Sequence, residues 1–469
     1  MATATTTWES THADTALRAF AARLGGELIR PGDAEYDAAR AVWNGAYDRR
    51  PALVVRAADT IDVIRAVTFA RERGLAVAVR SGGHSMAGHG TIDGGLVIDL
   101  STMKGLSVDP ERRVARVQPG LTWGEYAGQA QAYGLATSSG DMGSVGVGGL
   151  ALGGGIGWLV RKHGLTIDSL LSVDVVTADG RLLTASADEN PELFWALRGG
   201  GGNFGVATSF ELQLQPVGPV LGGAVFYPAA GAKDLLQAYG CLALEARDEL
   251  TTMAIVMQAP PLPFIPAEQH GRLVVAILVC YAGDLEDGQR AVAPLRALGA
   301  PIADVIGPMP YPALFALTAE GAVKGQHHAV RSMYLQHLDE AVLDTLLDHS
   351  QRMTSPLGMV QLRVLGGAMA RVPADATAFA HRDKPYMLTL VNGWQDAAHS
   401  ERHHAWVEQL WTALRPHASG VYVNFLADEG EARIREAYSP DTYQRLAAAK
   451  KAYDPTNFFR LNQNIKPLA

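Results

Sequence analysis

The residues with the clearest chemical potential are Arg80–Ser85, which read RSGGHS directly after a short run of valine and alanine. Glycines let a backbone approach a ligand closely, and successive amides in a turn form a nest that favours anions. Ser81 and Ser85 add hydroxyl groups, and His84 stands directly beyond the two glycines. This spacing indicates a loop suited to a pyrophosphate at the end of a strand.

Glycines are denser still in the segment 138–168, which reads SSGDMGSVGVGGLALGGGIGWLVRKHGLTID. Gly146, Gly148 and Ala151 match a GxGxxA dinucleotide fingerprint, but that fingerprint needs a strand before it and a helix after it. Neither is expected here, because a loop precedes the match and each later glycine costs a helix roughly 1 kcal/mol relative to alanine. The segment instead offers a wall without side chains that suits a flat ring system, or alternatively a turn between packed strands.

The elements that must position these loops are predicted from hydrophobic periodicity. A helix over 59–73 leads into a strand over 75–80, and RSGGHS ends that strand. From about residue 220 the strands are longer and amphipathic helices are expected. The further expected elements are strands over 96–100, 113–120 and 207–216, a helix opened by Thr122 and Glu125, a hairpin over 173–186, and helices over 339–353, 400–415 and from Ser439. We predict three parts, with boundaries at 1–218, 219–420 and 421–469.

Composition limits the partners and the location. The chain has 469 residues and a formal net charge of −8, so nucleic acid and acidic membranes are poor partners. It has no basic and apolar leader and no apolar run that could span a bilayer, so we expect a soluble, cytoplasmic protein without a membrane partner. Cys241 and Cys280 lie in apolar contexts without metal-ligand spacing, so we expect core thiols and no metal site.

Five motifs follow one another in a characteristic order along nearly the whole chain. They are RSGGHS, the glycine-rich segment 138–168, NPELFWALRGGGGNFGVATSFEL at 190–212, YVNFL at 422–426 and YDPTNFFRLNQNIKP at 453–467. In these motifs the chain resembles the berberine-bridge-enzyme-like flavoprotein oxidases of the vanillyl-alcohol-oxidase, or PCMH-type, FAD superfamily. The resemblance implies an α+β fold, with an FAD-binding domain of two α+β subdomains and a substrate domain whose antiparallel β-sheet is backed by helices.

The resemblance also implies which residues hold FAD. Ser81–Ser85 would hold the pyrophosphate, and His84 would in addition be bonded to the 8-methyl carbon of the flavin. The remaining FAD-binding positions that it implies are Arg80, Gly140, Asp141, Val145, Gly146, Gly149, Gly153, Gly154, Gly157, Gly205, Val206, Asn424, Asn462 and Asn464.

Two positions depart from the pattern of many relatives. These relatives attach the flavin a second time through a cysteine, and the corresponding position here is Met142. A thioether has no proton to lose and cannot act as a thiolate, so we expect a single link through His84. Leu150 replaces a histidine that is often found near the ribityl chain. Val145 occupies the position where a small side chain accompanies reaction with dioxygen.

The chemistry that the resemblance implies is the transfer of a hydride to flavin N5 from a C–H beside an alcohol, amine or activated ring. Dioxygen would then reoxidise the flavin and leave hydrogen peroxide. Tyr422 is the candidate base, and a nearby cation could help it ionise. Arg371, His381 and Arg382 are candidates for that help, although plant relatives carry a glutamate base where Arg371 aligns.

Other functions remain open at this point. The chain could be a flavin-dependent dehydrogenase with another electron acceptor, or a binding protein that kept the fold and lost FAD. The small-molecule substrate could be a sugar, a secondary amine, an alcohol or a natural-product ring. The adjacent pairs His327–His328 and His403–His404 are expected to be solvated histidines of helices or loops.

Overall fold

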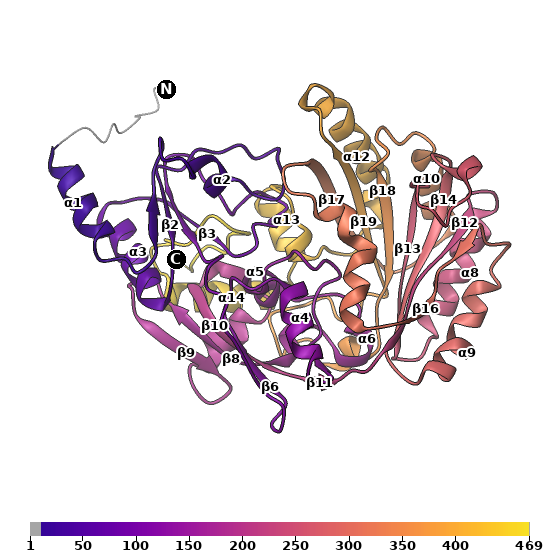
Figure 1. Cartoon of the computed structure of the whole chain (residues 1–469), viewed down its shortest axis with the longest axis horizontal. Helices are drawn as coiled ribbons and strands as arrows, with labels where there is room; N and C mark the ends of the chain where they lie inside the picture. Colours follow the sequence, from indigo (N-terminus) through magenta and orange to yellow (C-terminus); the bar gives the residue numbers. More distant parts are fainter. Residues whose placement is uncertain (1–10, 469) are drawn as a thin grey trace.

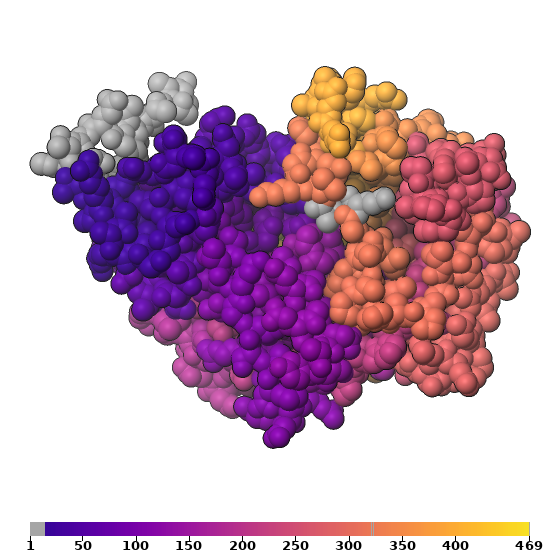
Figure 2. Space-filling model, viewed as in Figure 1, coloured from indigo at the N-terminus to yellow at the C-terminus, as the bar shows by residue number. Residues whose placement is uncertain are grey.

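The computed structural model describes residues 11–468, which form two parts side by side (Figure 1). The first part contains two smaller sheets, and the second is built on one large sheet. Residues from the N-terminal half and those around 300–400 occupy opposite sides of one face of the molecule and meet along its middle (Figure 2). The C-terminal helix α14 lies against the first part of the chain.

The first sheet has four strands in the order β1-β2-β4-β3. Strands β2, β4 and β3 are parallel, whereas β1 pairs with β2 in the antiparallel sense. Its elements are α1 (Thr11–Ala21), β1 (Glu27–Ile29), α2 (Tyr36–Arg40), β2 (Leu53–Arg56), α3 (Thr60–Glu72), β3 (Val77–Arg80) and β4 (Leu96–Asp99). The sequence placed α3 correctly because Asp59 caps it, accepting hydrogen bonds from the Ile61 and Asp62 amides.

The second sheet has five antiparallel strands in the order β5-β6-β10-β8-β9. Its strands are β5 (Leu106–Asp109), β6 (Val114–Val117), β8 (Leu170–Val176), β9 (Leu182–Ser186) and β10 (Val206–Gln213), and β7 (Leu135–Ala136) pairs separately with β11 (Gln215–Pro216). The helices between them are α4 (Trp123–Gln131), α5 (Val147–Gly153), α6 (Val160–His163) and α7 (Pro191–Leu197), with short 3-10 turns η1 (Thr166–Ser169) and η2 (Gly201–Asn203). Thr122 and Glu125 form the expected capping box of α4.

Helix α5 corrects one expectation from the sequence. The glycine-rich segment was predicted to contain no helix, yet Val147–Gly153 is helical and buries Val147, Ala151 and Leu152. Burial of these side chains in the core stabilises a helix that glycine propensity alone disfavours. The strand before it, β7, ends at Ala136 and does not run into the Gly146 turn, so the dinucleotide fingerprint is still absent.

The large sheet has eight strands, seven of them in the order β15-β12-β14-β13-β18-β19-β17, while β16 pairs with β12. They are β12 (Val220–Pro228), β13 (Leu250–Gln258), β14 (Leu273–Tyr281), β15 (Ala303–Asp304), β16 (Gly307–Met309), β17 (His327–Leu335), β18 (Met359–Val364) and β19 (Tyr386–Trp394). The pairings are all antiparallel. This is the helix-backed antiparallel sheet that the resemblance implies.

Alternate residues of the large sheet enter two different cores. On β13, Ala254 and Val256 pack in the core with the helices α8 (Ala232–Leu244), α9 (Leu285–Arg296), α10 (Glu340–Ser350) and α12 (Ser400–Leu414). Met253 and Ile255 on the opposite face join the core that extends into the first part. Because successive side chains of a strand point to opposite faces, one strand can serve both cores.

The remaining elements are short connections within the second part and the turns and helices that follow α12. They are η3 (Ala267–Gln269), η4 (Tyr311–Ala322), α11 (Ala368–Arg371), η5 (Ala397–His399), η6 (Arg415–His417), η7 (Val423–Phe425), α13 (Glu431–Glu436) and α14 (Pro440–Tyr453). Helix α14 begins at the predicted cap, where the Ser439 side chain accepts a hydrogen bond from the Thr442 amide. Its buried Lys450 forms a 2.6 Å ion pair with Asp454 and donates to the carbonyls of Asn203 and Phe459.

Two further findings concern the expectations from composition. Cys280 is a buried core thiol as expected, but Cys241 is exposed, so the expectation of burial was wrong for that residue. Within residues 11–468, no helix is both long and apolar enough to cross a membrane.

Candidate active site

A cavity of about 960 Å³ lies between the loops of the first part and one face of the large sheet. Most of the residues that the sequence singled out for FAD lie in its wall. They are Arg80, Ser81, Gly82, Gly83, His84, Ser85, Gly140, Asp141, Val145, Gly146, Gly149, Gly205, Val206, Asn424 and Asn462. Tyr422, the candidate base, lines the cavity as well.

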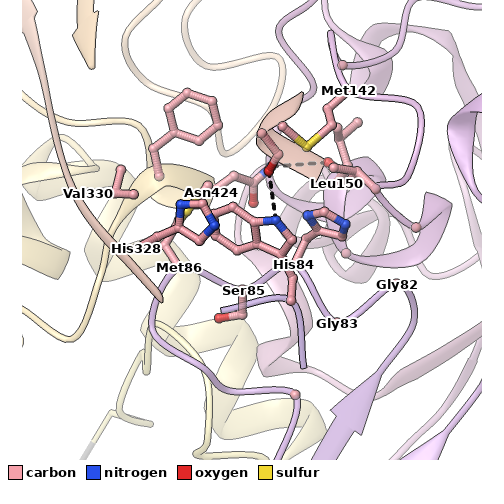
Figure 3. A pocket seen from close by; sticks show the side chains of 18 of the residues that line it. Gly82, Gly83, His84, Ser85, Met86, Met142, Leu150, His328, Val330 and Asn424 are labelled. Carbon is pink, nitrogen blue, oxygen red and sulfur yellow. Dashed lines mark hydrogen bonds between the residues drawn. The ribbon is translucent and has the colours of Figure 1, made fainter. Parts of the chain in front are cut away.

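The RSGGHS loop enters the cavity from the end of β3 (Figure 3). Gly83 has a φ of +73°, which glycine adopts at no steric cost. Among the described residues, no hydrogen bond uses the backbone amides of residues 82–86, so they are available to an anion. A Cβ atom on Gly82 would lie 2.3 Å from the amide nitrogen of Gly146, so this loop and the glycine-rich segment touch only because both positions are glycine.

His84 lies just beyond those amides. Its Nε2 atom and the Ser144 hydroxyl hydrogen-bond at 3.0 Å. Burial, with smaller contributions from His328 and Lys324, lowers the pKa of His84 to about 4. The imidazole is therefore neutral at neutral pH, and a neutral imidazole has a lone pair that can form a bond to carbon.

Some glycines of the wall face open space and others make room for side chains. A Cβ atom on Gly149, Gly201 or Gly202 would meet nothing within 4 Å. Gly153, by contrast, lies against Asn424, because a Cβ atom there would be 2.0 Å from the Asn424 Oδ1 atom.

Four predicted FAD positions are not among the described residues that line the cavity. They are Gly153, Gly154, Gly157 and Asn464. A Cβ atom on Gly154 would come within 2.8 Å of the Tyr422 ring, and one on Gly157 within 2.3 Å of the Ser139 carbonyl oxygen. Gly153, Gly154 and Gly157 therefore lie behind the cavity wall, where they leave room for the groups packed against them.

Tyr422 is buried, and its hydroxyl oxygen accepts two hydrogen bonds. The donors are the Gly155 amide at 2.6 Å and the Asn424 side-chain nitrogen at 2.8 Å. Both donors favour the phenolate, but burial has the larger effect and raises the pKa of Tyr422 to about 12. Tyr422 is therefore protonated at neutral pH in the structure described.

The three cationic groups suggested as helpers of Tyr422 lie elsewhere. The Arg371 side chain is 63% exposed and pairs with Asp248. His381 shares a 2.8 Å hydrogen bond with the Glu436 carbonyl. Arg382 is buried in an ion pair of 2.7 Å with Asp168. None of the three is among the described residues that line the cavity, so the geometry gives them no contact with a substrate.

The large sheet contributes wall residues that the sequence analysis missed. Arg363 forms a 2.5 Å ion pair with Asp141 and lies over the Phe425 ring. Thr389 hydrogen-bonds Arg363 at 3.3 Å and also lines the cavity. Strand β18 does alternate, because the polar Gln361 and Arg363 lie between buried aliphatic residues, and that alternation could have marked its face toward the cavity. Strand β19 is almost wholly buried and offers no such signal.

The histidine pairs also differ from expectation. His328 lies on β17, is 5% exposed, and lines the cavity. His403 is 7% exposed and hydrogen-bonds Thr354. The prediction of solvated histidines was therefore wrong for both of these residues, since strand and helix packing draws them inward.

The wall also contains the position of the expected second attachment. Met142 lines the cavity near Leu150 (Figure 3). Neither Cys241 nor Cys280 is among the described lining residues. Burial raises the pKa of the Cys280 thiol to about 12, which keeps it protonated.

The glycine-rich loops, their free amides and the cavity between them and the large sheet are features that suit a dinucleotide cofactor. The family model described as FAD binding domain matches residues 51–186, and the model described as Berberine and berberine like matches residues 421–466. (R)-6-hydroxynicotine oxidase from Paenarthrobacter nicotinovorans is 35% identical over 95% of this chain and 97% of its own length. Xylooligosaccharide oxidase from Thermothelomyces thermophilus is 30% identical over 91% of this chain and 89% of its own length.

Solved structures show the same relationship. 6-Hydroxy-D-nicotine oxidase from Arthrobacter nicotinovorans superposes with a TM-score of 0.86 at 32% identity, over 95% of this chain and 98% of that one. Physcomitrella patens BBE-like 1 gives a TM-score of 0.85 at 25% identity, over 97% of this chain and 99% of that one. The chain belongs to the berberine-like family of FAD-linked oxidoreductases.

The residues present fit FAD. The free amides of the RSGGHS loop suit its pyrophosphate, and the open faces of Gly149, Gly201 and Gly202 leave room for it. The buried Oδ1 atoms of Asn462 and Asn464 have no hydrogen-bond partner within the described chain. Asn462 lies in the wall, where a polar ligand atom could satisfy it.

Proposed function

We propose that the protein is an oxidase that removes a hydride from a C–H beside an alcohol, amine or activated ring and passes the two electrons to dioxygen. Bound FAD supplies the hydride acceptor and the site at which dioxygen is reduced to hydrogen peroxide. The proposal rests on one observation: the RSGGHS loop, Tyr422 and one face of the large sheet all line the same cavity.

The substrate we propose is a small, largely apolar amine or alcohol with a ring. Five side chains of the large sheet that line the cavity are apolar, namely Ile255, Met257, Val330, Met359 and Val391. Arg363 is already paired with Asp141, so it offers little charge to a ligand. The sheet also lines the cavity with five polar residues, Gln258, His328, Gln361, Arg363 and Thr389, so a heteroatom of the substrate has hydrogen-bonding partners on this face. The relative that oxidises 6-hydroxynicotine agrees with this class of substrate.

The proposed base is Tyr422. Its oxygen already accepts two hydrogen bonds, which hold the ring in place and stabilise the phenolate when the proton leaves. In the proposed reaction the ionised oxygen takes the proton of the substrate heteroatom while the hydride leaves carbon.

We further propose that FAD is attached once, through an imidazole nitrogen of His84. The new C–N bond replaces one hydrogen of the 8-methyl group and the N–H hydrogen of imidazole. The two electrons released with these hydrogens go to dioxygen, which becomes hydrogen peroxide. The neutral state of His84 and its place beside free amides support this assignment. Met142 offers no thiolate for a second bond.

Peroxide-coupled screening tests the oxidase proposal. Purified protein is offered apolar cyclic amines and alcohols beside cellobiose-like sugars, with an artificial electron acceptor as a parallel readout. We expect peroxide with the apolar amines or alcohols. If the flavin is reduced by a substrate but reoxidised only by the artificial acceptor, the protein is a dehydrogenase and the oxidase proposal is wrong.

Intact-mass measurement in acid tests the attachment. Wild type is expected to retain the mass of one FAD less two hydrogens, and His84→Ala is expected to release all of its flavin. Met142→Leu serves as the control and should stay singly attached. A covalent flavin in the His84→Ala protein would show that another residue forms the bond.

A further inference from the structure

Trp43 places an indole ring directly beside the proposed attachment histidine. Its ring is stacked on that of His84, with centroids 5.3 Å apart and an interplanar angle of 22°. The backbone amide of Trp43 donates to the carbonyl of Gly83, the residue before His84, at 3.0 Å. The indole N–H donates to the Gly321 carbonyl at 2.9 Å, so both the backbone and the ring of Trp43 are fixed.

The same indole also packs on His328. These two rings are 4.0 Å apart and within 13° of parallel. His84 and His328 lie close to each other in the cavity wall (Figure 3). We call the three rings of His84, Trp43 and His328 the ring stack.

The backbone around Trp43 joins the loop to the edge of the large sheet. Asn44 accepts a hydrogen bond from the His328 amide at 3.0 Å and donates to the His328 carbonyl at 2.9 Å. Gly45 donates to the Gln326 carbonyl at 2.8 Å, and Gly325 donates to the Trp43 carbonyl at 3.0 Å. Since β17 is the last strand of its sheet, these bonds use an edge that has no further strand.

His328 has no role in the chemistry proposed above, yet it is buried and lines the cavity. Neither of its ring nitrogens has a hydrogen-bond partner within the described chain. Burial, followed by the charge of His327, lowers the pKa of His328 to about 4. At neutral pH the imidazoles of His84 and His328 are therefore both neutral, and they pack on the Trp43 indole without a buried charge.

The stack and one hydrogen bond together determine the orientation of the His84 ring. The Ser144 hydroxyl and Nε2 hydrogen-bond, and the indole packs near-parallel to the imidazole with its centroid 5.3 Å away. Because these two contacts restrain the ring, the imidazole presents its other nitrogen, Nδ1, in one direction. Bond formation to carbon depends steeply on such alignment.

We propose that Trp43, backed by His328, is a positioning residue that holds the His84 imidazole in the orientation in which it bonds to the flavin. This inference rests on the attachment through His84 that is proposed above. Trp43 exchanges no proton or electron in that step, so its contribution is to the rate of attachment.

The test compares the covalently attached fraction of the flavin among full-length proteins that are folded and contain FAD. Each purified protein is incubated with excess FAD in air, and the attached fraction is followed by intact mass in acid. Total bound flavin is measured by absorbance before denaturation. We expect Trp43→Leu to bind FAD but to attach it about 10- to 100-fold more slowly than wild type. Trp43→Phe keeps a flat ring and should recover most of the rate.

His328 variants separate stacking from proton transfer. His328→Phe keeps an aromatic face without nitrogens and should attach FAD at close to the wild-type rate, whereas His328→Leu should be slower. An equal loss in both variants would show that the nitrogens act, which overturns positioning by stacking. Trp394→Leu is the matched control, since Trp394 stacks on His403 at 5.1 Å, away from the cavity.

Two results contradict different proposals. If wild type is attached through His84 and Trp43→Leu attaches FAD equally fast, the positioning role is wrong and the attachment stands. If wild type releases all its flavin in acid, the attachment is wrong and the positioning role fails with it. Thermal unfolding of each variant shows whether its FAD-binding fold is intact.

Discussion

At the scale of single residues, Tyr422 raises the sharpest chemical question. Two donors on its oxygen favour the phenolate, while burial raises its pKa to about 12. If the phenolate is the base, only a small fraction of the protein is active at neutral pH. That fraction grows about tenfold for each pH unit below the pKa.

The rate of flavin reduction in anaerobic stopped flow should therefore rise with pH, by about tenfold per unit, until it approaches the pKa of Tyr422. Tyr422→Phe should keep FAD, lose this dependence, and reduce the flavin about 10² to 10⁴-fold more slowly at high pH. Asn424→Ala removes one donor and should move the rise to higher pH, since the phenolate loses a hydrogen bond. A wild-type rate that is flat between neutral and alkaline pH would assign the base to another group.

At the same scale, we expect the Val145 side chain to affect how fast dioxygen reoxidises the flavin. Val145 lines the cavity, and its backbone is fixed because its carbonyl accepts a hydrogen bond from the Trp123 amide at 2.9 Å. Val145→Leu adds a carbon atom to the wall, so we expect reoxidation by dioxygen to slow by at least tenfold, or about 1.4 kcal/mol in the barrier.

The measurement for Val145 is the reoxidation of photoreduced protein mixed with air-saturated buffer. Val145→Ala should reoxidise as fast as wild type, and reduction by substrate should be little changed in either variant. Reoxidation of Val145→Leu at the wild-type rate would show that dioxygen reaches the flavin by another path.

At the scale of elements, the structure separates what the sequence could predict from what it could not. Helices α3 and α14 and the β8–β9 hairpin were predicted because caps, periodicity and a turn glycine act within a few residues. Helix α5 was missed because its stability comes from burial in the core. Motif glycines marked much of the cavity wall that we propose for FAD, whereas the sheet wall, with Arg363, Thr389 and His328, depends on long-range strand pairing.

Helix α5 also supports a prediction about the link between an element and the site. A Cβ atom on Gly153 would lie 2.0 Å from the Asn424 side chain, which donates to Tyr422. Gly153→Ala should therefore destabilise the protein by about 1–3 kcal/mol and slow flavin reduction, because Asn424 must move.

Gly128→Ala is the matched control for Gly153→Ala. Gly128 lies in α4, and a Cβ atom there meets nothing within 4 Å. This change should therefore stabilise the protein by up to about 1 kcal/mol and leave the rate of flavin reduction unchanged. Urea unfolding and stopped-flow reduction measure the two effects. Equal behaviour of the two alanine variants would contradict the packing of Gly153 against Asn424.

At the scale of the whole molecule, the C-terminal segment holds the flavin-binding part together. Helix α14 packs on α7, and its Lys450 is fully buried with Asp454. Lys450 also donates to the carbonyl of Asn203, which lines the cavity, at 2.7 Å. A single buried side chain thus connects the end of the chain with the wall of the cavity.

Breaking this buried pair is expected to cost far more than neutralising both of its members. Lys450→Met leaves the Asp454 carboxylate buried without its cation, with the Phe458 and Phe459 amides at 2.8 and 2.9 Å and the Thr456 hydroxyl at 3.4 Å as donors, so we expect a loss of about 3–5 kcal/mol. Lys450→Met/Asp454→Asn removes the charge as well and should recover a large part of that loss. The measurement is urea unfolding of FAD-loaded protein, with bound flavin followed in parallel. Because the Asn203 carbonyl loses its donor in both variants, both should also bind FAD more weakly when each is compared in a His84→Ala background, where the flavin is not attached. Unchanged FAD affinity in that background would show that the tail stabilises the fold without shaping the cavity.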